Sequence, residues 1–179
     1  MKPTVRAGVV IGLVVSLMLA ADPGAGRAAE DAPSGAASQA KQPTPAPAFT
    51  EKDIFAKKTI ALKKYLGKVV LLNFWATWCG PCKQEIPALM EIQASHDGQV
   101  AVLGVAVFSS DDDTERYTKD HRITYPVFYG SFDLMEKYDR VRTIPTTFII
   151  DRKGAIAAKV VGARTREQYE ALLEPLLSQ

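Results

Sequence analysis

The two cysteines of the chain, Cys79 and Cys82, lie three positions apart and have the side chains best suited to do chemistry. In the first turn of a helix, residues at i and i+3 share one face, so thiols at this spacing can form a disulfide with little backbone movement. Unpaired backbone N–H groups and the positive end of the helix dipole favour a thiolate at the helix start. We therefore expect Cys79 to be the nucleophile, and Cys82, one turn further in and less exposed, to resolve the mixed disulfide.

Other uses of a cysteine pair fit this chain less well. A structural zinc site needs four ligands, and the chain adds only two distant histidines, His96 and His121. A static disulfide across so short a loop would stabilise the fold weakly. A thiol peroxidase would need a further cysteine in its own activating loop, and the chain has none. Two thiolates suit Cu(I), so a copper chaperone is the alternative to redox exchange; for redox exchange itself we expect no metal and no other cofactor.

A strand and a helix are predicted to hold the pair in place. Residues 68–75 form an apolar, β-rich run after Gly67, which is typical of a strand buried on both faces. Apolar residues then recur at helical spacing, which predicts a helix from Pro81 to about Ser95. Proline suits the first helical turn, because its missing N–H has no partner there. Cys79 therefore falls at the junction between strand and helix.

Strands and helices alternate along the rest of the chain. Strands are predicted at 100–108 and 125–129, helices at about 111–122 and 132–138, a hairpin at 146–161, and a small hairpin within 49–62. Thr165 and Gln168 form a capping box for a last helix that ends near Leu177. This order predicts an α/β fold whose central mixed sheet is flanked by helices.

Composition divides the chain at Phe49. All the aromatic residues lie at or after this position, so the packed domain is predicted to span 49–179. Hydrophobic residues make up 47% of the chain and charged residues 23%, as in ordinary soluble domains. From Phe49 onward, 18 Lys and Arg face 17 Asp and Glu, a net charge of +1. Without a basic surplus, nucleic acid is not an expected partner.

The residues before the domain are predicted to be a targeting segment followed by a linker. Residues 1–21 place Lys2 and Arg6 before an apolar run, the layout of a signal peptide or a retained signal anchor. The run Ala7–Ala21 would span ~22 Å as a helix, short of the ~30 Å hydrocarbon core, so both cleavage and anchoring in the membrane are open. Residues 22–48 are rich in Ala and Pro and are predicted to be a linker. The domain is therefore expected outside the cytoplasm.

Two segments carry a family resemblance. The sequence FWATWCGPCK at 74–83 resembles the active-site segment of thioredoxins, and TIPTTF at 143–148 resembles their cis-proline loop. The strand VVLLNFW at 69–75 and the Glu85-Ile86-Pro87 segment are more similar to the TlpA/ResA branch, exported thioredoxin-like proteins usually held at a bacterial membrane. The resemblance implies a thioredoxin fold with an N-terminal extension and a central insert. It also implies a thiol:disulfide oxidoreductase.

The resemblance also implies a substrate-binding surface around the cysteines. The bond between Ile144 and Pro145 is implied to be cis and to lie against the cysteine pair, where neighbouring backbone groups can pair with an extended client peptide. Trp78, Gly80 and Pro81 are implied to flank the same site. For Trp78, a role as an ordinary core aromatic is the alternative.

One position departs from the thioredoxin pattern. Thioredoxins carry a buried Asp six residues before the first cysteine, where this chain has Asn73, which cannot titrate. Glu85 matches a carboxylate that the TlpA/ResA branch carries near its active site. We hypothesise that Glu85 helps set the thiol pKa values or carries the proton, and the alternative is a solvated charge on the helix.

The direction of electron flow is predicted from the residues between the cysteines. Gly80-Pro81 resembles thioredoxin, with a potential of about −270 mV, rather than strong oxidants near −120 mV. A reductant in the bacterial periplasm, or on the outer face of the cytoplasmic membrane, would need electrons, which the resemblance suggests come from a membrane thiol-electron transporter. Its expected clients are disulfides of apocytochromes c during cytochrome c biogenesis, or of copper-site proteins in oxidase assembly.

Overall fold

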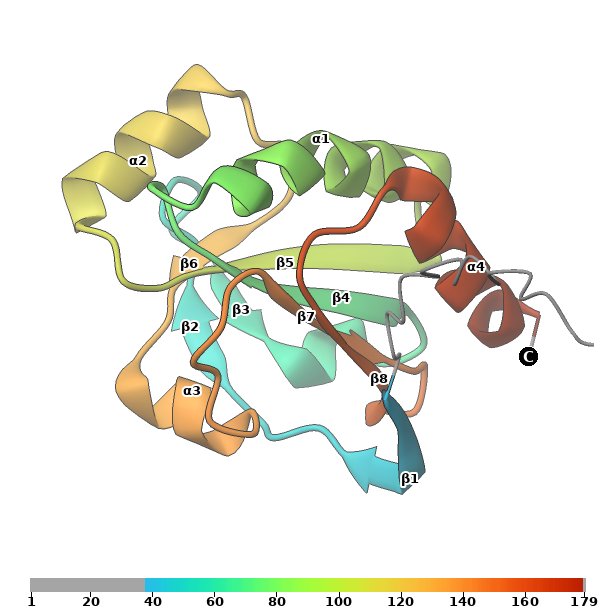
Figure 1. The fold of residues 1–179 in the computed structure, drawn as a ribbon. Helices are drawn as coiled ribbons and strands as arrows, with labels where there is room; N and C mark the ends of the chain where they lie inside the picture. The colour runs from blue at the N-terminus through green and yellow to red at the C-terminus, as the bar shows by residue number, and fades with distance from the viewer. Residues whose placement is uncertain (1–37, 179) are drawn as a thin grey trace, which may run out of the picture. The chain divides into compact units, whose positions relative to one another are not determined.

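A computed structural model of the protein describes the backbone of residues 38–178 and the side chains from Thr44 to Ser178, and every structural statement below concerns these residues. The predicted signal segment 1–21 lies outside them. The elements follow in the order β1 (Ser38–Pro45), β2 (Thr50–Lys52), β3 (Thr59–Ala61), the 3-10 helix η1 (Leu62–Tyr65), β4 (Val69–Trp75), α1 (Gly80–Ser95), β5 (Val100–Ala106), α2 (Asp111–Asp120), β6 (Val127–Tyr129), α3 (Phe132–Lys137), β7 (Thr146–Ile150), β8 (Ala155–Val161) and α4 (Arg166–Leu177) (Figure 1).

The main sheet has six strands in the order β1-β8-β7-β4-β5-β6, and β2 and β3 form a separate hairpin. At its centre, β4 pairs in parallel with β5 and antiparallel with β7. β6 continues the parallel half, and β8 and β1 continue the antiparallel half. Every residue of β4 and β5 is buried, as their continuous apolar runs predicted. The expected mixed sheet and both hairpins are confirmed.

Helices cover both faces of this sheet. In Figure 1, α1, α2 and α4 lie on one side of the sheet, and α3 lies on the other with β2 and β3. The helix ends follow the sequence signals: the capping box of Thr165 and Gln168 is formed in full at the start of α4, and Ser110 caps α2. None of the helices within 38–178 is long and apolar enough to cross a membrane.

The N-terminal side of the domain differs from the prediction. The segment 22–48 was predicted to be a linker, but its later part contains β1, which pairs antiparallel with β8 from Ser38 opposite Lys159 to Pro45 opposite Ala155. The N–H of Ala46 also donates to the carbonyl of Gly154 at 2.9 Å. The physical reason is that the open edge of β8 offers backbone donors and acceptors that any sequence with free N–H and C=O groups can satisfy. Composition does not detect such pairing.

Candidate active site

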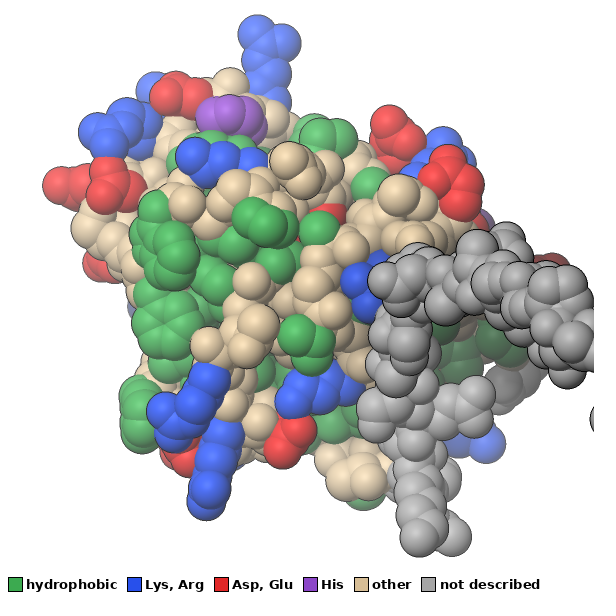
Figure 2. All heavy atoms as spheres, in the orientation of Figure 1, with side chains coloured by type: hydrophobic (Ala, Val, Ile, Leu, Met, Phe, Trp, Pro, Cys, Tyr) green, Lys and Arg blue, Asp and Glu red, His purple; other side chains and the backbone are tan. Residues whose placement is uncertain are grey.

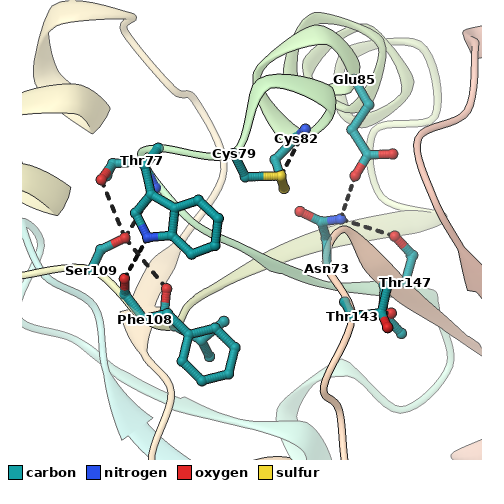
Figure 3. The surroundings of a disulfide bond; sticks show 12 residues. Asn73, Thr77, Cys79, Cys82, Glu85, Phe108, Ser109, Thr143 and Thr147 are labelled. Carbon is teal, nitrogen blue, oxygen red and sulfur yellow. Dashed lines mark hydrogen bonds between the residues drawn. A yellow bond between two sulfur atoms is a disulfide. The ribbon is translucent and has the colours of Figure 1, made fainter.

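Cys79 and Cys82 form a disulfide at the start of α1 (Figure 3), and their Cα atoms lie 5.3 Å apart. Cys79 is the N-cap residue of the helix, and its Sγ accepts a hydrogen bond from the N–H of Cys82 at 3.2 Å. Pro81 occupies the first turn, as expected. After reduction, the same N–H and the helix dipole would stabilise a Cys79 thiolate.

The two sulfurs differ in access to solvent. Cys79 is 5% exposed, whereas Cys82 is fully buried. Only Cys79 is therefore positioned to meet a partner protein, and Cys82 faces the interior. This difference agrees with the roles of attacking and resolving thiol that the spacing predicted.

An apolar rim lies beside the disulfide. Trp78 is 64% exposed and donates its indole N–H to the carbonyl of Phe108 at 2.6 Å, and Phe108 is itself 52% exposed. The Oγ of Ser109 accepts from the N–H of Thr77 at 3.0 Å, which ties the loop before α1 to the loop after β5. Figure 2 shows hydrophobic side chains gathered on the surface beside this end of α1. Trp78 is thus a surface residue and not a core aromatic, whereas Trp75 is fully buried.

The proline loop reaches the same end of the sheet. The bond between Ile144 and Pro145 is cis, as the resemblance implied. Thr146, the next residue, pairs with Phe74 near the end of β4, just before the chain enters the cysteine loop. The carbonyl of Pro145 accepts from the N–H of Gly162 at 2.8 Å, which fixes this loop to the end of β8.

Beneath the disulfide lies a buried carboxyl group. Glu85 is only 1% exposed, so its alternative reading as a solvated helix charge is wrong. Its Oε1 accepts from the Nδ2 of Asn73 at 2.7 Å, and the same nitrogen donates to the Oγ1 of Thr147 at 2.9 Å (Figure 3). This cluster could not be predicted from the sequence, because its residues come from β4, α1 and β7, which are far apart along the chain.

The second carboxylate oxygen of Glu85 is also fully engaged. Oε2 accepts from the hydroxyl of Tyr169 at 3.1 Å and from the N–H of Arg164 at 3.2 Å. The Tyr169 oxygen lies 2.8 Å from the Oγ1 of Thr147. Because the single phenolic hydrogen points to Glu85, the Thr147 hydroxyl donates to Tyr169. The hydrogen-bond ring is therefore complete when Glu85 is ionised.

Burial controls the acidity of this group. Loss of hydration raises the pKa of Glu85 to about 7, although hydrogen bonds from Asn73, from the backbone of Arg164 and from Tyr169 pull the pKa down. Burial also raises the pKa of Tyr169, and the nearby Glu85 charge raises it further. Glu85 can therefore gain or lose a proton near neutral pH, whereas the phenol stays a hydrogen-bond donor.

Water has a route to the edge of this cluster. An open cleft of about 470 Å³ lies between α1 and the segment before α4, and Glu85 is one of its lining residues together with Gln84, Arg164 and Gln168. The carboxyl group is buried, but a proton that it carries has only a short distance to travel to solvent.

Asn73, Thr147 and Tyr169 were not predicted as members of this cluster, and neither was the neighbouring Tyr125. The buried atoms without a hydrogen-bonding partner in the described part of the chain include Asn73 Oδ1, Trp75 Nε1 and Tyr125 OH. Gly104 lies opposite Asn73 in β5, and a Cβ there would lie 3.0 Å from Tyr125 Cε2 and 3.2 Å from Trp75 Nε1. A glycine inside an apolar strand was the available signal for this close approach.

Metal-binding side chains were compared across residues 38–178. No group of three or more His, Cys, Asp or Glu that could hold a metal ion occurs among the residues the structure describes.

A redox disulfide at a strand-to-helix junction, next to a cis-proline loop in a sheet of this topology, defines a thioredoxin-fold thiol-disulfide oxidoreductase. The AhpC/TSA family model matches residues 43–159, and the chain belongs to this thioredoxin-like family. Thioredoxin-like protein YneN of Bacillus subtilis is 36% identical over 133 residues, covering 72% of this chain and 76% of YneN. Thiol-disulfide oxidoreductase ResA of Bacillus cereus is 35% identical over 136 residues, covering 73% of this chain and 76% of ResA.

A solved structure agrees with this assignment. The thiol:disulfide interchange protein of Chlorobium tepidum TLS superposes with a TM-score of 0.71 at 29% identity, covering 77% of this chain and 99% of that one. The thioredoxin fold and the oxidoreductase activity that the cysteine segment and the proline loop predicted are confirmed.

Proposed function

We propose that this oxidoreductase works outside the cytoplasm as a reductant of client-protein disulfides. The observation that carries the direction is the Gly80-Pro81 pair between the cysteines, which resembles thioredoxin. Thioredoxin and strong oxidants differ by about 150 mV, or roughly 7 kcal/mol for two electrons. A dithiol at the thioredoxin end of this range gives its electrons to disulfides of higher potential, such as strained or exposed ones.

The exposed rim supports the first chemical step. The Cys79 thiolate attacks one sulfur of the client disulfide and forms a mixed disulfide, and the other client sulfur leaves as a thiolate that takes up a proton. Trp78, Gly80 and Pro81 border the attacking sulfur, and the loop at Ile144 and Pro145 offers backbone groups to an extended client segment.

Glu85 supports the second step. In its ionised form the buried carboxylate accepts the proton of Cys82, and the Cys82 thiolate then attacks Cys79 Sγ. The new bond is the Cys79–Cys82 disulfide, and the bond that breaks releases the second client sulfur as a thiolate, which takes up a proton from water. Two electrons have moved from the dithiol to the client. A pKa of about 7 suits this role, because the carboxylate is then both available and basic enough at neutral pH.

Export is supported by the basic, then apolar, segment 1–21. An oxidising compartment would leave the pair as a disulfide, so the proposal requires a membrane thiol-electron transporter to reduce it again. Apocytochrome c cysteines and cysteines of copper-site proteins are the proposed clients, since both must be reduced before haem or copper is attached.

The redox potential of the Cys79–Cys82 pair tests the direction. We expect a value close to about −270 mV by equilibration with a reference dithiol, and a value near about −120 mV would overturn the reductant assignment. Clients can be captured with Cys82→Ser, which should accumulate mixed disulfides at Cys79, and a Cys79→Ser, Cys82→Ser double variant is the matched control. Capture of oxidoreductases alone, without substrates, would argue against the proposed clients.

The role of Glu85 is tested by Glu85→Gln. We expect the release of the client from the mixed disulfide to slow at neutral pH and to lose its pH dependence near about pH 7. Unchanged thiol pKa values and an unchanged exchange rate would refute the role. Cu(I) titration of the reduced protein tests the copper alternative, which requires tight binding that disappears in Cys79→Ser.

A further inference from the structure

The carboxamide of Asn73 makes hydrogen bonds through its nitrogen but none through its oxygen. The side chain is completely buried in the middle of β4. Its Nδ2 makes two hydrogen bonds, to Glu85 and to Thr147, whereas its Oδ1 has no partner. A buried carbonyl oxygen without a donor is unfavourable, so a group that supplies a hydrogen to it in another state of the protein would stabilise that state.

The orientation of this amide follows from its partner. The ionised Glu85 carboxylate can only accept hydrogen bonds, so the donor nitrogen of Asn73 must face it and the oxygen must face the opposite way. In Figure 3 the Asn73 oxygen is on the side of the disulfide, and its nitrogen is on the side of Glu85. The Asn73 oxygen therefore points toward the cysteine pair, and its nitrogen points toward the carboxyl group.

The cysteines offer a hydrogen only after reduction. In the disulfide, neither sulfur carries a proton, so neither can donate to Asn73. Reduction by two electrons and two protons breaks the S–S bond and leaves a thiol on Cys82, which is fully buried on this side of α1. A thiol S–H is a weak donor, and a buried carbonyl oxygen is a good acceptor for it.

We propose that Asn73 is the hydrogen-bond acceptor for the resolving thiol, so that its Oδ1 is unpaired in the disulfide form and accepts from the Cys82 S–H in the dithiol form. The amide then links Cys82, through Oδ1, to Glu85, through Nδ2. This link stabilises the dithiol relative to the disulfide. The inference uses the oxidoreductase activity of the pair and does not depend on the proposed clients or on export.

Infrared spectroscopy of a single-thiol protein tests this bond directly. Cys79→Ala leaves Cys82 as the only cysteine in the chain and introduces no competing hydroxyl group. We expect the S–H stretching band of the full-length variant to lie below that of a free thiol, and adding Asn73→Leu should return it to the free position. Thr147→Val, which removes a partner of Nδ2 only, should leave the band shifted. A free-thiol band in Cys79→Ala, or a shift that survives Asn73→Leu, would overturn the proposal.

Two further measurements distinguish loss of the hydrogen bond from misfolding of the Asn73→Leu variant. Asn73→Asp keeps an oxygen in place, so the Cys82 band should stay shifted in that variant, and loss of the shift would contradict the proposal. In the protein with both cysteines, Asn73→Leu should move the equilibrium with glutathione toward the disulfide about tenfold, or about 30 mV. No change in Asn73→Leu, or a change toward the dithiol, would count against the proposal.

Discussion

The two faces of the central sheet are built from the same strands and do different work. Along β4, Val70, Leu72 and Phe74 point to one face, and Leu71, Asn73 and Trp75 point to the other. The first face is filled with aromatic rings. The ring centroids of Phe74 and Phe148 lie 5.9 Å apart, and those of Tyr138 and Phe148 lie 5.1 Å apart. We call it the aromatic face.

The second face, which we call the catalytic face, lies under α1 and α4. It is also packed with apolar side chains, but it contains the disulfide and the buried group of Asn73, Glu85, Thr147 and Tyr169. A buried carboxyl costs stability when it is charged, and Glu85 offsets part of this cost through its hydrogen bonds to Asn73, Tyr169 and the backbone of Arg164. The comparison indicates that the packed rings of the aromatic face stabilise the fold. The catalytic face is less stabilising, because it holds a buried proton acceptor near a thiol.

The largest expected effect comes from the aromatic face. Phe148→Ala should lower the free energy of unfolding by about 3–5 kcal/mol, because it removes a buried ring and leaves a cavity. The redox potential of the cysteine pair should stay unchanged, because Phe148 points away from it. Denaturant unfolding and glutathione equilibration measure the two quantities. A large change in potential would show that the faces are not independent.

Next in size is the pH dependence that Glu85 imposes on the catalytic face. Its folded pKa of about 7 lies above the unfolded value of about 4.3, so the folded state binds the proton more tightly. The stability contribution is therefore present below pH ~4.3 and is lost as the pH rises through about 7, a change of about 4 kcal/mol. Unfolding of the oxidised protein should show this decline, and Glu85→Gln should remove it. An equal decline in the variant would assign it to another group.

Tyr169→Phe should have a smaller effect. The variant loses the hydroxyl that donates to Glu85 and accepts from Thr147, at an expected cost of about 1–3 kcal/mol. The cost should be larger near pH ~8 than near pH ~5, because the ionised carboxylate is the form that needs the donor. Tyr138→Phe, on the aromatic face, is the control, since its hydroxyl bonds only the carbonyl of Pro47. A pH-dependent cost in that control would contradict the assignment.

Trp78→Ala should change stability least, by about 0.5 kcal/mol, because the side chain is mostly exposed. It should nevertheless slow exchange with protein disulfides more than exchange with glutathione, which touches little of the rim. Stopped-flow kinetics with both substrates would measure the ratio. Equal slowing of both would place the effect of Trp78 on the thiol itself rather than on client contact.

Local features of this protein could be predicted from residues that are close together in the chain. The cysteine pair, the cap and proline that begin α1, the buried runs of β4 and β5 and the capping box of α4 each depend on residues within one or two turns. Together they predicted the α/β fold and a redox cysteine pair, and the resemblance of segments 74–83 and 143–148 to thioredoxins implied the thioredoxin fold.

The surroundings of the disulfide depend on contacts between residues that are far apart in the chain. Glu85 and Asn73 are hydrogen-bonded and are 12 residues apart in the chain. The hydrogen bond between Glu85 and Tyr169 joins residues 84 positions apart, and the one between Asn73 and Thr147 joins residues 74 positions apart. Spacing along one element carries no information on such contacts, and composition equally missed the pairing of β1 with the edge of β8. The acidity of Glu85 and the unpaired oxygen of Asn73 both result from burial, which exists only once the helices close over the sheet.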